Sequence, residues 1–325
     1  MLGVATFIKP KWLIQYPFVF FSSAALLQVA AYVFGFYASG RYYFMPFDVI
    51  IPPFGEVLLY AIAFAGLAVK YKNRCILSVL IFHTLAIISL TAVYNLRGFG
   101  MVLPLFICYM ALTAGVFIKD VNRRIKCIST AIPLILIVVT IVLAPARYLH
   151  RVDAFLSGGK IDPYGAGYMQ IMTNHWIASS NFIGGTDSLY GGYSPKTLLR
   201  FYITDYPIVN IISTTGWILG IFIVLLIAAF AIRLFVLIKQ ARNKDGYFII
   251  FALGFVLASQ LVLPVLMNFN LFPQTGLWLP LIYMRGVGFI THIITIGIVM
   301  AMRDGSASIF QKRGNCFYGR IEKDT

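Results

Sequence analysis

Long apolar stretches separated by short polar ones dominate this chain. A membrane-spanning helix needs roughly 20 predominantly apolar residues, and eight stretches approach or exceed that length. They cover residues 16–38, 50–69, 75–93, 99–118, 128–146, 208–237, 247–268 and 286–302. The last stretch is short, and the stretch 208–237 is long enough to tilt or to project from the bilayer. The pattern predicts an all-α, polytopic membrane protein with about eight transmembrane helices.

The overall composition agrees with that prediction. Of the 325 residues, 60% are hydrophobic and 11% are charged, whereas a soluble domain carries about 25% charged residues. The apolar stretches leave no room for a separate soluble domain, so residues 1–325 are predicted to form a single membrane domain. No Cys or His spacing indicates a metal site.

Basic residues are distributed unevenly between the two sides of such a helical zigzag. Of the 26 Lys and Arg residues, 18 fall on the side that holds both chain ends. They lie in the N-terminal "KPK", in 70–74, 119–126 and 239–244 with Arg233, and in the tail 303–325. Because cytoplasmic loops carry an excess of Lys and Arg, both termini are predicted to be cytoplasmic. The net charge of +15 then indicates topology and contact with membrane lipids, not binding of nucleic acid.

One segment on the opposite, extracytoplasmic side is much longer than the other loops. Residues 147–207 are rich in Gly, Ser, Tyr and Asn, and we expect their middle, about 166–180, to form a short helix at the membrane interface. A loop of this length in a compact membrane protein is usually functional. The alternative is a solvated loop with scattered ion pairs. Its charged residues are Arg147, Arg151, Asp153, Lys160, Asp162, Asp187, Lys196, Arg200 and Asp205.

Asp205 stands where this loop meets the sixth apolar stretch. Asp is a favoured N-cap residue and suits the positive end of the helix dipole. Pro207 fits the first turn of a helix and supports that interpretation. Asp205 is therefore a helix N-cap, a functional acid, or both.

Four other ionisable residues lie within or near the apolar stretches: Glu56, His83, Arg285 and His292. Such groups are costly in lipid and usually face a cavity or a partner. We expect His83 and His292 to be hydrogen-bonded packing residues. Glu56 follows "IIPPFG", which indicates a broken helix start, so it either stabilises the first helical turn or lines a cavity.

Several segments resemble motifs of one family. "RVDAFLSGGKIDPYGAGYMQ" (151–170) is similar to "RI..FLDP..DP.G.GYQ", and "YITDYPIVNIISTTGWILG" (202–220) is similar to "HTDFIFAVIGEELGLIG". "QLVLPVLMNFNLFPQTGLWLPLIYMRG" (260–286) resembles "Q..INIG...GLLPVTGIPLPFISYGG", and "GRYYFMPFDVIIPP" (40–53) more weakly resembles "G..RWI.LG.F.IQPSE". These are patterns of the SEDS family (FtsW, RodA and SpoVE), the membrane glycosyltransferases of bacterial peptidoglycan. Their order along the chain and the predicted topology also fit that family.

The chain departs from the family pattern in several places. The family typically has ten helices, and the resemblance implies that this chain begins at the end of the second, so we expect it to be N-terminally short. The glutamate of "PSE" falls on Phe54, with Glu56 as a substitute two residues on. The other replacements are "RGFGM" (97–101) for "PDLGT", Ser213–Thr214 for "EE" and "YMRGV" (283–287) for "SYGGS". Thr204–Asp205 is kept, and Asp205 falls at the position of the family's catalytic aspartate.

The resemblance implies a reaction and the residues that perform it. The family joins lipid-linked disaccharide-pentapeptides (lipid II) into glycan strands during division, elongation or sporulation, alongside a class B penicillin-binding protein. A sugar hydroxyl attacks an anomeric carbon and displaces undecaprenyl pyrophosphate. Asp205 is the implied general base, because partial desolvation at the bilayer edge favours that role. Substrate binding is implied for Arg151, Lys196, Arg200, Arg285, Glu56 and Thr204, and arginine suits phosphate contacts. No cofactor is expected, although a divalent cation could assist.

Two other classes of function stay open. A flippase or transporter would move the same lipid-linked precursor without forming a bond, and it would need a polar path to the inner face. A catalytically inactive SEDS-like scaffold would bind a class B penicillin-binding protein and would tolerate loss of Asp205. The inner halves of the predicted helices carry few charges, which favours the polymerase over the transporter.

Overall fold

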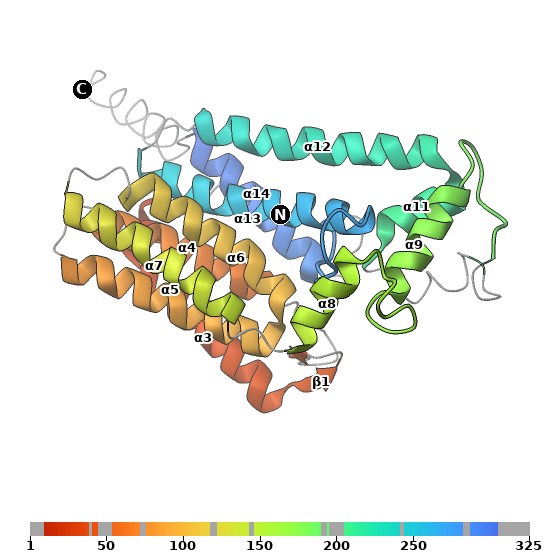
Figure 1. Cartoon of the computed structure of the whole chain (residues 1–325). Coiled ribbons are helices and arrows are strands. Elements are labelled where there is room, and N and C mark those ends of the chain that lie inside the picture. Colours follow the sequence, from red (N-terminus) through yellow and green to blue (C-terminus); the bar gives the residue numbers. More distant parts are fainter. Residues whose placement is uncertain are drawn as a thin grey trace, which may run out of the picture. The chain divides into compact units, whose positions relative to one another are not determined.

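The structure is a computed structural model of the chain, and it shows a mostly helical protein (Figure 1). It describes residues 10–38, 41–44, 54–71, 76–117, 122–142, 146–189, 194, 205–240, 244–281 and 287–304. The helices are α2 Pro10–Gln15, α3 Pro17–Phe34, α4 Phe54–Tyr71, α5 Ile76–Arg97, α6 Phe99–Leu112, the π-helix η2 Thr113–Phe117, α7 Arg123–Val142, α8 Ala146–Leu156, α9 Tyr168–Ser179, α11 Pro207–Thr215, α12 Trp217–Lys239, α13 Lys244–Asn268 and α14 Val287–Asp304.

Each predicted apolar stretch contains helix among its described residues. Among the residues searched, six helices are long and apolar enough to cross a membrane. They are Pro17–Phe34, Phe54–Tyr71, Ile76–Leu96, Phe99–Phe117, Trp217–Lys239 and Gly246–Asn268. The other two predicted spans fall on α7 and on α14, whose apolar part Gly288–Met302 is shorter. The expected polytopic helical architecture is confirmed, with six rather than eight spans identified by length and composition.

The stretch 208–237 differs from the single long helix that its apolar character suggests. It forms two helices, α11 and α12, which are separated at Gly216. Gly216 has φ +103°, a conformation that only glycine adopts readily. A Cβ at this position would also lie 2.7 Å from the carbonyl oxygen of Phe182. The break therefore depends on one residue that an apolar pattern does not reveal.

A small hairpin modifies the all-α expectation. Strands β1 (Phe36–Ala38) and β2 (Arg41–Tyr43) pair antiparallel, with Phe36 opposite Tyr43 and Tyr37 opposite Tyr42. The ring centroids of these two pairs lie 5.5 Å and 5.0 Å apart. Aromatic cross-strand pairs of this kind stabilise a hairpin, which explains a strand pair among described residues that are mostly helical.

The chain divides into two compact units. The first unit comprises residues 1–130, 234–256 and 290–325, and the second comprises residues 131–233 and 257–289. The division falls within α7, α12, α13 and α14. Most of the predicted basic tail, from residue 305 onward, lies outside the described residues.

In the first unit, α4 is the central helix. It contacts α2, α3, α5 and α6, and its residues from Tyr60 to Ala68 are buried. Aromatic rings from three elements meet beside it. The ring centroid of Phe82, in α5, lies 5.0 Å from that of Phe117 in η2 and 6.0 Å from that of Tyr109 in α6. This packing gives the first unit a dense apolar core.

The two intramembrane histidines belong to that first unit. His83 of α5 is buried, with its Nδ1 2.7 Å from the hydroxyl of Tyr109 and its Nε2 3.3 Å from the hydroxyl of Ser129. His292 of α14 is also buried, and its ring centroid lies 4.2 Å from that of Phe54. The expectation that His83 is a hydrogen-bonded packing residue is confirmed.

Candidate functional site

Asp205 lies in a turn directly before α11, and the residue is half-buried. The N-cap position of α11 belongs to Tyr206, which makes no side-chain cap bond, and Pro207 occupies the first turn as expected. A helix start leaves several backbone N–H groups without partners in the helix itself. The question is which residue bonds them.

Asn268, the last residue of α13, supplies that cap. Its Oδ1 accepts hydrogen bonds from the backbone N–H of Ile208 (3.0 Å) and of Val209 (3.2 Å). These are the amides to which a capping side chain normally bonds. Tyr206 thus holds the N-cap position that the sequence suggested for Asp205, and Asn268 bonds the two amides.

The other side of the same amide group also contacts the turn. Asn268 Nδ2 donates to the carbonyl oxygen of Asp205 (3.1 Å) and to that of Pro264 (2.8 Å). An Asn side chain offers two acceptor lone pairs and two donors, and all four are used here. Asn268 is fully buried, so this amide is a fixed part of the interior of the second unit.

A buried apolar cluster holds the residue next to Asp205. Tyr206 and Val209 pack with Met172 and Trp176 of α9. The partly buried side chains around this cluster are Tyr168, Met169 and Ile177. Helices α9 and α11 lie side by side (Figure 1). The predicted short helix at about 166–180 is therefore present as α9, and it packs against the turn that carries Asp205.

A second asparagine links the end of α13 to α9. Asn270 has a positive φ of 53°, a conformation that Asn tolerates better than most residues. Its Nδ2 lies 2.8 Å from Asn174 Oδ1, 2.9 Å from Thr173 Oγ1 and 3.3 Å from the carbonyl oxygen of Gln170. The segment after α13 thus contacts α9 through Asn270, two residues after the contact with α11 through Asn268.

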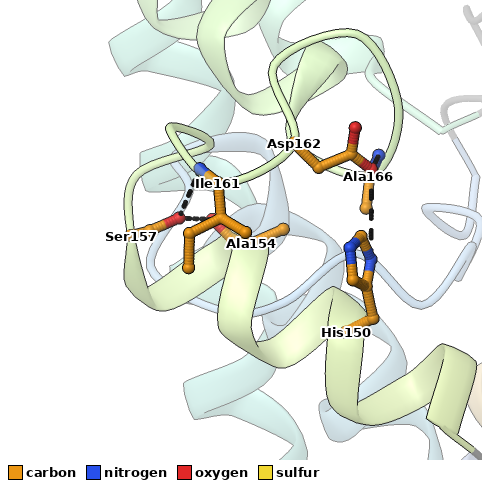
Figure 2. Close-up of polar contacts among 6 residues, drawn as sticks. All are labelled: His150, Ala154, Ser157, Ile161, Asp162 and Ala166. Carbon is orange, nitrogen blue, oxygen red and sulfur yellow. Dashed lines mark hydrogen bonds and ion pairs between the residues drawn. The ribbon is translucent and has the colours of Figure 1, made fainter.

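The glycine-rich turn between α8 and α9 is held by its own polar groups (Figure 2). Asp162 Oδ2 accepts a hydrogen bond from the N–H of Ala166 (2.7 Å) and lies 3.9 Å from His150 Nδ1. Ser157 Oγ donates to the carbonyl oxygen of Ala154 (2.9 Å) and accepts from the N–H of Ile161 (3.3 Å). Asp162 therefore has a structural role within the segment 151–170.

The end of α11 is fixed by the chain that follows α9. The N–H of Thr186 bonds the carbonyl oxygen of Ser213 (2.8 Å), and the N–H of Gly184 bonds that of Thr215 (3.0 Å). The hydroxyls of Ser213 and Thr214, which replace the family's paired glutamates, donate to the carbonyl oxygen of Asn210 at 3.2 Å and 2.6 Å. Both hydroxyls therefore contact the backbone of their own helix.

The remaining predicted site residues lie elsewhere or cannot be placed. Arg151 is exposed on α8, and α8 contacts α9 through the bond from Gln170 Nε2 to the carbonyl oxygen of Phe155 (3.3 Å). Glu56 is buried in the first turn of α4, in the other unit. Lys196, Arg200, Thr204 and Arg285 lie outside the described residues. Within the described part of the chain, no group of three or more His, Cys, Asp or Glu could hold a metal ion.

Sequence reasoning missed Asn268 and Asn270. Both belong to "MNFN" (267–270), inside the segment that carries the family resemblance. An isolated Asn near a helix end is an ordinary turn residue, so the residue type alone does not predict a contact with α11 or α9. Its position in the aligned segment was the one available signal.

Comparisons with known proteins agree on one family. The family model FTSW_RODA_SPOVE, described as "Cell cycle protein", matches residues 56–307. The probable peptidoglycan glycosyltransferase FtsW of Thiomicrospira cyclica is 28% identical over 178 residues, covering 53% of this chain and 45% of the relative. A protein of the same description from Francisella salina is 25% identical over 206 residues, covering 62% and 49%. The aligned regions span about half the length of these curated relatives.

Solved structures share the fold. A structure described as the "structural coordination of polymerization and crosslinking by a peptidoglycan synthase complex" has a TM-score of 0.69 and 16% identity, covering 94% of this chain and 85% of that one. The rod shape determining protein RodA of Thermus thermophilus has a TM-score of 0.58 and 14% identity, covering 93% and 82%. These similarities, at low identity, establish a RodA-like fold.

Proposed function

The chain belongs to the SEDS family of multi-pass membrane proteins (FtsW, RodA and SpoVE), and from this premise we propose that it is a peptidoglycan glycosyltransferase. It would polymerise lipid II outside the cytoplasmic membrane, with both termini in the cytoplasm. The process served would be division, elongation or sporulation. The names of the FtsW relatives support the reaction class.

Asp205 is the proposed general base. It would accept the proton from the sugar hydroxyl that attacks the anomeric carbon of the second lipid II molecule, while undecaprenyl pyrophosphate leaves. The observation that supports this role is the fixed turn at Asp205, because Asn268 caps α11 and also bonds the carbonyl oxygen of Asp205. Asn268 and the buried cluster around Tyr206 thus hold the turn that carries this half-buried acid.

Positive charge near the departing pyrophosphate would come from arginine and lysine. The candidates are Arg151, Lys196, Arg200 and Arg285, with Glu56 and Thr204 as further substrate contacts. Arginine forms paired hydrogen bonds to phosphate oxygens, and such donors stabilise the charge that develops on a leaving group. The exposed position of Arg151 on α8 is compatible with contact to a lipid headgroup.

A class B penicillin-binding protein is the proposed protein partner. The support is the solved peptidoglycan synthase complex, whose description joins polymerisation with crosslinking and whose fold this chain shares. A glycan strand made by one subunit and crosslinked by the other would require the two proteins to act together. Membrane lipids complete the proposed surroundings.

The test is glycan-strand formation from purified lipid II by the full chain in proteoliposomes, with and without the partner. Wild-type protein should form strands, and Asp205→Asn should lose about 10²–10⁴ of the rate, as expected when a general base is removed. Asn caps helices as well as Asp does, so an N-cap role would leave the Asn variant active. Asp187→Asn, at an exposed acid of the same segment, should retain the wild-type rate.

The same experiment separates the two alternatives. A flippase would move labelled lipid II across the vesicle membrane without forming strands. An inactive scaffold would form none with or without the partner, and Asp205→Asn would still bind that partner. Wild-type polymerisation by the Asp205→Asn variant would remove Asp205 from the mechanism.

A further inference from the structure

Asn268 bonds the backbone both before and after Tyr206. Its Nδ2 bonds the carbonyl oxygen of Asp205, and its Oδ1 bonds the N–H groups of Ile208 and Val209. A planar amide thus joins the exit of the turn to the start of α11 through a single side chain. Moving Asn268 would move the turn and the helix start together.

We propose that Asn268 is a positioning residue that sets where the Asp205 carboxylate lies when substrate is bound. The inference rests on the proposed function of Asp205 as the general base. Asn268 belongs to another helix, α13. It bonds the main-chain carbonyl of Asp205, and in this proposal it does not itself contact the substrate.

The amide orientation is fixed by its neighbours. On one side it meets two N–H donors, of Ile208 and Val209, and on the other two carbonyl acceptors, of Asp205 and Pro264. Rotating the amide by half a turn would oppose donor to donor and acceptor to acceptor. The bond to Pro264, one turn earlier in the same helix, also ties the side chain to its own backbone. Asn268 therefore presents one rigid arrangement to the turn.

The start of α11 has little intrinsic stability of its own. The N-cap residue Tyr206 makes no side-chain cap bond, and α11 has only nine residues. Isolated helices shorter than about 12–15 residues are marginal in water, so the beginning of α11 depends on the contacts it makes with other elements. Without Asn268, the apolar cluster of Tyr206 and Val209 with α9 would remain, but the bonds from Asn268 to the carbonyl of Asp205 and to the two amides would be lost.

Position matters more than stability for a general base. A displacement of about 1 Å at a reacting group can lower the rate about 100-fold. A positioning role therefore predicts a fall in kcat in a protein that is still folded and still binds lipid II. A purely structural role predicts a loss of folded protein with the kcat of the remaining molecules unchanged.

Asn270 provides a matched control two residues away. It is also an asparagine that joins the end of α13 to another element, but its contacts are on α9: Gln170, Thr173 and Asn174. Asn95 provides a second control, because its exposed side chain bonds only the carbonyl oxygen of Thr91 (2.9 Å) in its own helix among the contacts described.

The experiment measures kcat and KM for lipid II polymerisation by full-length protein carrying Asn268→Ala, Asn268→Asp, Asn270→Ala or Asn95→Ala. Hydrogen exchange of a peptide covering residues 205–213 is followed in the same samples. We expect Asn268→Ala to lower kcat about 100-fold with little change in KM, and to speed exchange at Ile208 and Val209. Asn270→Ala should retain most of the wild-type kcat, and Asn95→Ala all of it.

Asn268→Asp distinguishes capping from positioning if the alanine variant folds poorly. The carboxylate keeps acceptors for the two amides but loses both N–H donors, including the one to the carbonyl of Asp205. We expect protected amides together with a reduced kcat. A wild-type kcat in Asn268→Asp, or an equal loss of kcat in Asn270→Ala, would overturn the proposal. Loss of fold in both Asn268 variants would also overturn it, because Asn268 would then be a stability residue.

These outcomes are distinct from failure of the proposed function. An active Asp205→Asn variant, or an inactive wild type, would remove the reaction on which the positioning role depends. An inactive Asp205→Asn variant alongside a fully active Asn268→Asp variant would remove the positioning role alone.

Discussion

The backbones of Gly159 and Gly167 pack directly against each other in the turn between α8 and α9. A Cβ built on Gly167 would clash with the Cα of Gly159. Gly159 also has φ +86°. The glycines of "GGKIDPYGAG" (158–167) are thus explained by crowding as well as by turn geometry.

Gly167→Ala should therefore destabilise this turn. Overpacking of this kind costs about 1–3 kcal/mol, and the nearest atoms are backbone, which cannot rotate away. Thermal unfolding in detergent, with protease sensitivity of the segment 157–167, measures the effect. Gly55→Ala is the control, because a Cβ there meets nothing within 4 Å and Ala favours helix over Gly. Equal stability of the two variants would contradict the crowding.

Gly216→Ala should loosen the corner between α11 and α12. The backbone there has φ 103° and ψ 169°, and holding a non-Gly residue in such a region costs about 1–3 kcal/mol. The added methyl would also displace the carbonyl of Phe182. The expected result is a lower unfolding temperature and faster cleavage in residues 181–186. Gly115→Ala, whose Cβ would make an ordinary 3.5 Å contact with Phe251, should show neither change.

Replacing His83 should destabilise the first unit through its hydrogen bonds. His83→Phe keeps a ring of similar shape but removes both nitrogen contacts, to Tyr109 and Ser129. The expected cost is about 1–2 kcal/mol, as for polar contacts between membrane helices. Adding Tyr109→Phe removes the buried hydroxyl left behind, so the double variant should lose less stability than the sum of the two single variants. Additive losses would show that the two residues are not coupled.

The predicted orientation can be tested by labelling cysteines in intact cells. In a chain whose four native cysteines are replaced by serine, Lys160→Cys should react with a membrane-impermeant maleimide from outside. A chain that keeps only Cys127, which is exposed on α7 and follows the basic segment 119–126 that is predicted to be cytoplasmic, should react after permeabilisation. Labelling of position 160 only after permeabilisation would reverse the assigned topology.

The helices were largely predictable because a membrane span requires a continuous apolar stretch, which is visible in the sequence alone. A span must be apolar along its whole length, so 247–268 and α13 coincide almost residue for residue. The break at Gly216 was not predictable, since glycine is common in membrane helices and its close approach to the carbonyl of Phe182 is visible only in the fold. Helix α8 was missed because it is amphipathic and lies inside a segment whose composition is typical of a loop.

The candidate site was predictable only in part. Asp205 was identified by resemblance, and its place beside a helix start was inferred from Pro207. The residue that caps α11 was not inferred, because Asn268 is far from it along the chain and neither segment alone requires the other. Contacts between residues far apart along the chain follow from the fold, and they cannot be inferred from a single sequence.

The separation of 60 residues between Ile208 and Asn268 also sets an order of events during synthesis. A ribosome adds about 5–20 residues per second, so Asn268 appears roughly 3–12 s after Ile208 at that pace. In that interval α12 and nearly all of α13 are made, while α11 exists without its cap. The turn at Asp205 is therefore completed late in biogenesis. A ribosome that stalls before residue 268 leaves a membrane-inserted chain that carries the aspartate but not the contact that organises it.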